Sequence, residues 1–282
     1  MISRPVSLKR VLITLVALAG VFLLLYAATF KDLFQTWSTE EDYSHGFLII
    51  PVSLYLVWRR KDELLKQPFH PNKWGIPILA VWAALYFLGY AGDISTFVTY
   101  SMIVLILGTV ITIAGNAIAK LVLFPILFLF FMLPIPSEIY TMLTNPLKLI
   151  ATNASVWVLN LLNVPVYQEG NLMHLPHYSM QVVVACSGIR SLISVVALAL
   201  LMGYVLFKSN VKRSILFLFS LPISILGNIL RITVTGLLAY HVSSEMAEGY
   251  SHTLAGLVTF TISFIVLFLG VYLIQWIAPE KG

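Results

Sequence analysis

The chain has 282 residues, of which 59% are hydrophobic and only 10% are charged, and its mean hydropathy is +0.92. Soluble domains carry about 25% charged residues, so this composition excludes a water-soluble protein and predicts an all-α protein that crosses a membrane several times. The single cysteine excludes an intrachain disulfide. In a membrane protein the net charge of +5 reflects cytoplasmic loops, and we expect no nucleic-acid partner.

The first half of the chain predicts five membrane helices joined by short polar loops. An apolar run over 11–30 follows three basic residues. It is too long for the core of a signal peptide and lacks a convincing cleavage site, so we expect a retained first helix. An acidic loop is expected at 31–45 and a basic loop at 59–74. The other helices are expected at 46–58, at 75–91, at 95–114 and in a run ending near 133.

The second half predicts three more membrane helices, preceded by a segment that does not span. Residues 134–185 begin after two prolines, and apolar residues then recur at helical spacing up to about 163, which indicates one or two interfacial helices. Residues 164–185 predict an extended hairpin, which must lie outside lipid or be buried in protein. The last three helices are expected at 188–207, 214–240 and 252–277. We treat 1–282 as one integral membrane domain.

The distribution of charge predicts the orientation of these eight spans. With this segmentation, 13 of the 17 Lys and Arg residues fall on one side of the membrane, and 9 of the 12 acidic residues fall on the other. Cytoplasmic loops are enriched in Lys and Arg, so both termini are expected in the cytoplasm. Cys186, Arg231 and His252 then lie at the outer ends of their helices, at one membrane depth.

Cys186 is the first candidate site residue. It follows a run of valines and precedes an apolar helix, beside Ser187, Gly188 and Arg190. Backbone N–H groups at a helix start lower the pKa of a thiol, which favours a nucleophile. The alternative is a small buried residue, because free cysteine packs like a hydrophobe. Arg190 could add to the positive field, form a structural ion pair or anchor the helix.

Arg231 and Asn228 form the second candidate group. Arg231 lies within an apolar helix, where arginine costs about 2.5–3.5 kcal/mol and usually faces a protein interior. Asn228 lies three residues earlier, so the two side chains share a helix face. A structural ion pair with an outer carboxylate is the alternative to a functional role.

Histidines provide the remaining candidates. His252 begins the last helix, with Gly256 one turn later, and is either a functional residue or an ordinary interfacial one. His45 precedes the second helix and either begins that helix or supports the site. His174 and His177 lack the cysteine or carboxylate partners of a metal site, so we expect neither a metal nor another cofactor.

Four motifs resemble those of the exosortase and archaeosortase family. They are residues 185–191 (Ala-Cys-Ser-Gly-Ile-Arg-Ser), 228–232 (Asn-Ile-Leu-Arg-Ile), 252–256 (His-Thr-Leu-Ala-Gly) and 43–47 (Tyr-Ser-His-Gly-Phe). Their order and spacing are similar to the family's over about residues 40–277, and the last motif is similar to the bacterial branch. The extra C-terminal domain of some relatives is not expected here.

The resemblance implies a membrane-embedded cysteine peptidase or transpeptidase. Its substrates would be exported proteins with a C-terminal sorting tail, made of a Pro-Glu-Pro-like motif, a transmembrane helix and basic residues. Cys186 would be the nucleophile, Arg231 the oxyanion-stabilising or substrate-orienting cation and His252 the general acid–base. Asn228, Arg190, Ser187, Gly188 and His45 would support the site.

The same resemblance implies a location and leaves alternatives open. It places the protein in the inner cell membrane with its site at the periplasmic or extracellular face, where a substrate passes to an unidentified surface acceptor. Because residues 134–185 do not span the membrane and precede Cys186 directly, we expect them to roof the site. Two other classes also fit the sequence: a polytopic transporter whose permeation path contains Arg231, and a non-catalytic membrane component of exopolysaccharide export. A purely hydrolytic intramembrane protease differs only in its acceptor.

Overall fold

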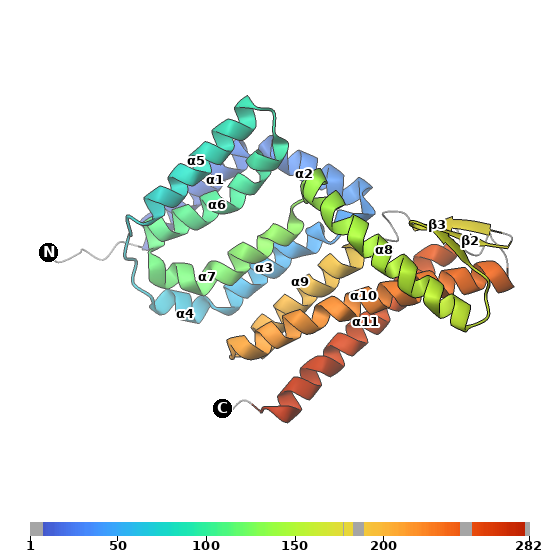
Figure 1. Cartoon of the computed structure of the whole chain (residues 1–282). Helices are drawn as coiled ribbons and strands as arrows, with labels where there is room; N and C mark the ends of the chain where they lie inside the picture. The colour runs from blue at the N-terminus through green and yellow to red at the C-terminus, as the bar shows by residue number, and fades with distance from the viewer. Residues whose placement is uncertain (1–7, 177, 183–188, 243–249, 280–282) are drawn as a thin grey trace. The chain divides into compact units, whose positions relative to one another are not determined.

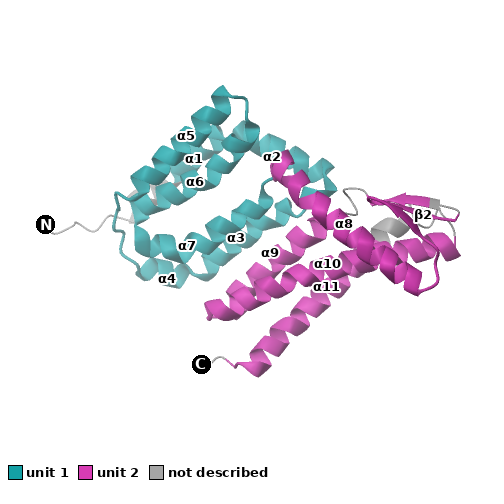
Figure 2. Cartoon of the chain, in the orientation of Figure 1, with its two compact units in different colours: residues 1–134 teal, residues 135–282 magenta. Residues whose placement is uncertain are grey.

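The computed structural model describes residues 8–176, 178–182, 189–242 and 250–279, and the chain divides into two compact units at Pro134 (Figures 1 and 2). Unit 1 is helical. Its elements are α1 (Leu8–Leu25), α2 (Ala27–Thr39), η1 (Glu41–Tyr43), α3 (Gly46–Arg59), α4 (Lys61–Lys66), α5 (Gly75–Ala91), α6 (Ser95–Ala114), α7 (Asn116–Phe128) and η2 (Leu129–Met132).

Unit 2 combines helices with a small sheet. Its elements are α8 (Ser137–Leu161), β1 (Tyr167–Glu169), β2 (Leu172–Leu175), β3 (Tyr178–Gln181), α9 (Ile189–Leu206), α10 (Asn210–His241) and α11 (Tyr250–Ile277). The strands form an antiparallel sheet in the order β1-β2-β3. The extended segment predicted at 164–185 is therefore confirmed for its described residues, with one more strand than a simple hairpin.

The helices confirm an all-α membrane protein but do not fix the number of spans. Within the described residues, four helices are long and apolar enough to cross a membrane: α6, α9, α10 and residues Ala255–Ile277 of α11. The count rises to six if each of two bent helix pairs is one span. The predicted eight spans and cytoplasmic termini therefore stay predictions.

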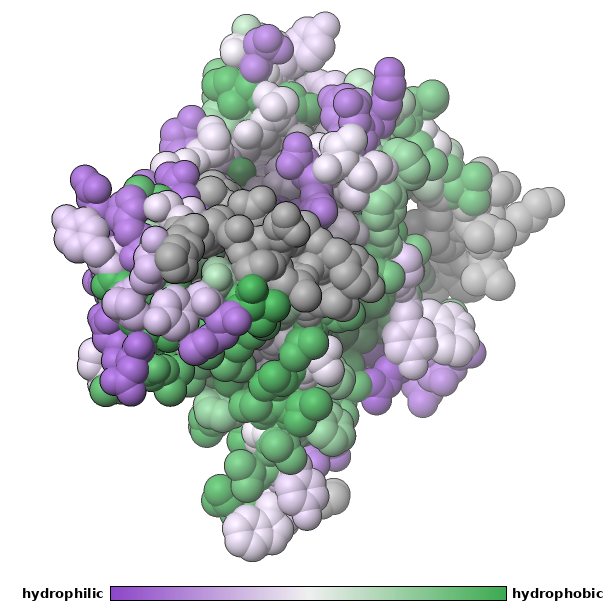
Figure 3. All heavy atoms as spheres, turned by 90° about the vertical axis from the view of Figure 1, so that its right-hand side faces the viewer, coloured by the Kyte–Doolittle hydropathy of each residue, from purple (hydrophilic) through white to green (hydrophobic). Residues whose placement is uncertain are grey.

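Exposed apolar side chains fit a lipid environment. Hydrophobic side chains form a continuous area below the grey atoms in Figure 3. On α11, Leu257 and Trp276 are 62% and 74% exposed. Water would oppose such exposure, whereas hydrocarbon does not, so these surfaces agree with a membrane-embedded chain.

Three predicted boundaries in unit 1 and unit 2 were wrong. The expected loop at 31–45 is helical up to Thr39, because the first helix bends by 68° at Tyr26 and continues as α2. Tyr26 is fully buried at the bend, where its hydroxyl lies 2.6 Å from Ser101 Oγ and accepts a hydrogen bond from Trp82 Nε1. Similarly, α4 occupies part of the expected 59–74 loop, and α10 begins at Asn210, four residues early.

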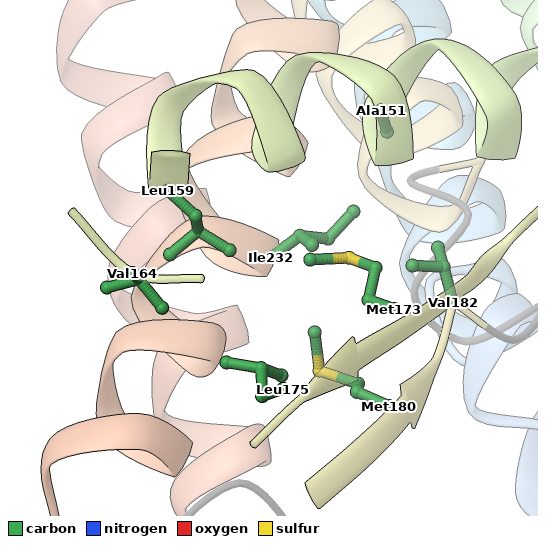
Figure 4. Close-up of a cluster of buried hydrophobic side chains, with 8 residues drawn as sticks. All are labelled: Ala151, Leu159, Val164, Met173, Leu175, Met180, Val182 and Ile232. Carbon is green, nitrogen blue, oxygen red and sulfur yellow. The ribbon is translucent and has the colours of Figure 1, made fainter. Parts of the chain in front are cut away.

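Unit 2 is built around α10, which contacts α8, α9 and α11. Its first half packs with α9 and α11 in a buried cluster. Its second half is covered by α8 and the sheet, whose inner face is apolar (Figure 4). That buried cluster contains Ala151, Leu159, Val164, Met173, Leu175, Met180, Val182 and Ile232. The predicted interfacial segment therefore packs on protein, and its helical part is one helix with Pro146 inside it.

Three side chains of unit 1 bind the carbonyl groups at the end of η2. Trp37 Nε1 donates to the Met132 carbonyl at 2.9 Å, and the Tyr100 hydroxyl donates to the Pro134 carbonyl at 3.3 Å. His45 Nε2 lies 3.0 Å from the Phe131 carbonyl, so this nitrogen carries the proton. Carbonyl groups at a helix end lack intrahelical donors, and these side chains satisfy them.

We expect Gly75→Ala to destabilise unit 1. A Cβ at Gly75 would lie 2.6 Å from the Thr112 backbone nitrogen and 2.8 Å from the Gly108 carbonyl oxygen, so α5 and α6 would have to separate. Overpacking of this kind typically costs about 1–3 kcal/mol, which thermal unfolding in detergent would detect. Gly20→Ala is the control, because nothing lies within 4 Å of its added Cβ. Equal melting temperatures for both variants would contradict the expected clash.

We expect His45 to make stability depend on pH. Burial lowers the pKa of His45 below its ordinary value of 6.5, so the unfolded chain binds the proton more readily than the folded chain. The stability due to neutral His45 is present above about pH 6.5 and is lost as the pH falls below it. His45→Gln keeps a donor for Phe131 and should show a smaller loss of melting temperature between about pH 7 and pH 5. An unchanged slope in His45→Gln would refute the assignment.

Candidate functional site

Arg231 is the centre of the candidate site in unit 2. It lies about 31 Å along α10 from Asn210, at 1.5 Å per residue, which matches the thickness of a hydrocarbon core of about 30 Å. Its side chain is only 6% exposed. Arg231 Nη2 donates a hydrogen bond of 2.8 Å to Asn228 Oδ1, and Asn228 is itself 4% exposed. The predicted shared face of these two residues is therefore observed as a direct contact.

Helix α11 approaches the same guanidinium group. A Cβ built at Gly256 would lie 3.9 Å from Arg231 Nη1. One turn earlier on α10, Gly227 lies directly against Ser263 of α11, so the two helices also pack closely beside the site. His252 belongs to α11 and precedes Gly256 by four residues, which places both on one helix face, about 6 Å apart along the axis. The side chain of His252 lies outside what the structure describes.

The sheet contributes the other wall of the site. A small pocket is lined by one end of β3 and by α10. Its residues are Met180, Gln181, Val182, Arg231, Ile232 and Thr235. Arg231, Thr235 and Gln181 are the polar residues of this lining, and the other three are apolar. Because Val182 is four residues before Cys186, this pocket lies where the described chain approaches the predicted nucleophile.

The structure describes some of the other predicted site residues and not others. Cys186, Ser187 and Gly188 lie outside the described residues. Arg190 is the half-buried second residue of α9. His45 belongs to unit 1, where burial lowers its pKa and its ring binds the Phe131 carbonyl. Its role as a supporting site residue stays a prediction.

Metal-binding residues do not gather in the part of the chain that the structure describes. No group of three or more His, Cys, Asp or Glu residues lies together among the described residues. His174 instead accepts or donates a 2.8 Å hydrogen bond with Ser179 Oγ and stacks on Tyr167. These contacts lie on the outer face of the sheet, away from its buried methionines.

Sequence reasoning placed Thr235 on the helix face of Asn228 and Arg231 but did not single out Gln181 or Val182 as site residues. The sequence carried a signal for each of them. Thr235 lies one further turn along the face of Asn228 and Arg231. Side chains alternate between the two faces of a strand. Because Met180 and Val182 are apolar and face inward, Gln181 between them is expected to face outward. The missing information was which helix the strand would meet.

The comparisons identify the family. The sequence description of the transmembrane exosortase family matches residues 37–269. Comparison with curated proteins and with solved structures gave no match. The matched region begins before the 43–47 motif and contains the segment around Cys186, the Asn228–Arg231 pair and His252. The chain therefore belongs to the transmembrane exosortase family.

Proposed function

We propose that this protein is a membrane-embedded cysteine transpeptidase that removes the C-terminal sorting tail of exported proteins. One observation carries the proposal: a buried arginine lines a pocket together with the strand that leads to Cys186, and also lies against the helix that contains His252. Family membership supports protein substrates with sorting signals and a membrane setting. The motif, the acceptor and the three catalytic roles are part of the proposal.

The chain itself limits how far Cys186 can lie from this pocket. Fully extended chain spans at most about 3.6 Å per residue, so a residue four positions after Val182 is within about 14 Å of it. Val182 and Ile189, the described residues on either side, are each 1% exposed. A thiol in this connection can therefore reach the neighbourhood of Arg231.

The proposed reaction begins with attack of the Cys186 thiolate on the carbonyl carbon of the scissile peptide. The C=O π electrons move to oxygen, and the resulting oxyanion is stabilised by the Arg231 guanidinium, which is oriented by the hydrogen bond that it donates to Asn228 Oδ1. Fixed donors of this kind act most strongly where water is excluded. His252 then gives its proton to the departing amine as the C–N bond breaks, which leaves a thioester on Cys186.

The second half-reaction resolves the thioester. A nucleophile, either an acceptor group or water, loses a proton to His252 and attacks the thioester carbon, and the C–S bond breaks to return the Cys186 thiolate. Transfer and hydrolysis differ only in this nucleophile. We further propose eight spans with cytoplasmic termini and an outward-facing site in the inner cell membrane, because the charge distribution requires that orientation.

We expect Cys186→Ala to abolish removal of the tail. A reporter protein with a Pro-Glu-Pro-like sorting tail would be co-expressed with each form of the enzyme, and its C-terminus would be determined by mass spectrometry. Loss of the nucleophile leaves no route to the thioester. Cleavage of the reporter by Cys186→Ala would eliminate Cys186 as the nucleophile. A mass added at the new C-terminus of the wild-type product would distinguish transfer from hydrolysis.

We expect Arg231→Gln to reduce the rate of tail removal by about 10²–10³, the usual effect of losing one oxyanion donor. Arg213→Gln is the matched control, because Arg213 lies on the same helix but binds the Phe207 carbonyl near the other end. The measurement is the rate of reporter cleavage, with the amount of folded enzyme measured for each variant. A similar loss of rate in both variants would indicate that the arginines act through stability alone.

A further inference from the structure

Strand β3 has an open edge beside the candidate site. In the sheet order β1-β2-β3 it pairs with β2 only, among the residues that the structure describes. Open edges usually carry a charged residue or proline, which prevents other chains from pairing with them. Strand β3 consists of Tyr178-Ser179-Met180-Gln181 and has neither. An edge without this protection is suited to receive another strand.

The register shows which backbone groups lie at the open edge. Val182 N–H donates to the Asn171 carbonyl at 2.8 Å, so Val182 directs its backbone groups toward β2. Backbone direction alternates along a strand; Met180 therefore also bonds to β2, whereas Ser179 and Gln181 direct their N–H and C=O groups to the open edge. Their side chains lie on the exposed outer face.

The open edge leads directly to Arg231. Gln181 and Val182 line the same small pocket as Arg231 and Thr235 of α10. A strand added to β3 would lie about 4.8 Å from it, which is the spacing of any sheet. A chain in that position would run past Gln181, at the end of β3 that lines this pocket.

We infer that β3 binds the extended sorting motif of the substrate as a fourth strand of the sheet. Strand addition of this kind obtains affinity from backbone hydrogen bonds and specificity from alternate side chains. It suits the Pro-Glu-Pro-like motif because prolines, which lack an N–H group, can occupy the alternate positions that face away from β3. The central residue then exchanges hydrogen bonds with Gln181. This inference rests on the proposed function.

The first experiment compares proline substitutions at the two edges of the sheet. Gln181→Pro removes an N–H group that points to the open edge and leaves the bonds between β2 and β3. Gln168→Pro is the control, because the Gln168 N–H group points away from the sheet at the opposite edge, in β1. The Gln168 side chain also donates to Asn153 Oδ1 and the Gly170 carbonyl, so the amount of folded enzyme is measured for both variants. We expect reporter cleavage to fall about tenfold or more in Gln181→Pro, as one backbone bond is lost and the motif is displaced, and to stay near wild type in Gln168→Pro.

A second variant separates loss of binding from loss of folding. Gln181→Ala keeps the N–H group, so it should cleave the reporter about tenfold faster than Gln181→Pro. Alkylation of Cys186, the only cysteine in the chain, by iodoacetamide should be unchanged in Gln181→Pro, because a small reagent needs no docking strand. Normal cleavage by Gln181→Pro would overturn the inference. Failure of the proposed function looks different: Cys186→Ala would then process the reporter like wild type.

The third experiment observes the added strand directly. In a Cys186→Ala background, Gln181→Cys provides one thiol on the outer face of β3. Single cysteines are placed at successive positions of the reporter motif, and disulfide formation is measured in membranes. Cross-linking should alternate with a period of two, because only alternate side chains lie on that face. Uniform cross-linking, or dimers of the enzyme without reporter adducts, would overturn the inference.

Discussion

The buried guanidinium of Arg231 is the constraint on which unit 2 depends. An arginine in the middle of an apolar helix is unfavourable in lipid, so protein must surround it. Asn228 binds it from the same helix, Gly256 lets α11 approach it without a side chain in the way, and the end of β3 borders it from another direction. Removing any of these elements would bring the cation closer to hydrocarbon.

The cover over the second half of α10 follows from that constraint. Ser155 of α8 donates a hydrogen bond of 3.2 Å to the Ile229 carbonyl, and Leu159 packs where Gly236 leaves space. The sheet adds an apolar inner face whose side chains point toward Leu159 and Ile232 (Figure 4). Strands have unpaired edges that lipid cannot satisfy, so this sheet is stable only beside protein and at the membrane boundary. Because the sheet packs against α10, its inner face contacts protein and not lipid.

The sequence predicted the helices and strands better than it predicted the contacts between distant residues. Long apolar runs indicated the membrane helices, and the spacing of Asn228 and Arg231 predicted that they share a helix face, because these signals are local. The bend at Tyr26 was missed because it depends on Ser101 and Trp82, which lie far along the chain. The pocket between Gln181 and Arg231 was missed for the same reason: alternation predicts that Gln181 faces outward, but not which helix its strand will meet.

The proposed cleavage of a peptide bond within a helical membrane protein poses a physical difficulty that the sheet would address. The transmembrane tail of the proposed substrate would enter lipid as a helix, and a helix satisfies its own backbone groups. A nucleophile needs the scissile bond in extended chain, and each N–H or C=O group released by unwinding costs several kcal/mol in hydrocarbon. In the strand addition that we infer, the outward groups of Ser179 and Gln181 would offer these freed groups new partners near Arg231. A strand edge therefore lowers the cost of the conformation in which the thiolate can attack, which a bundle of helices alone cannot do.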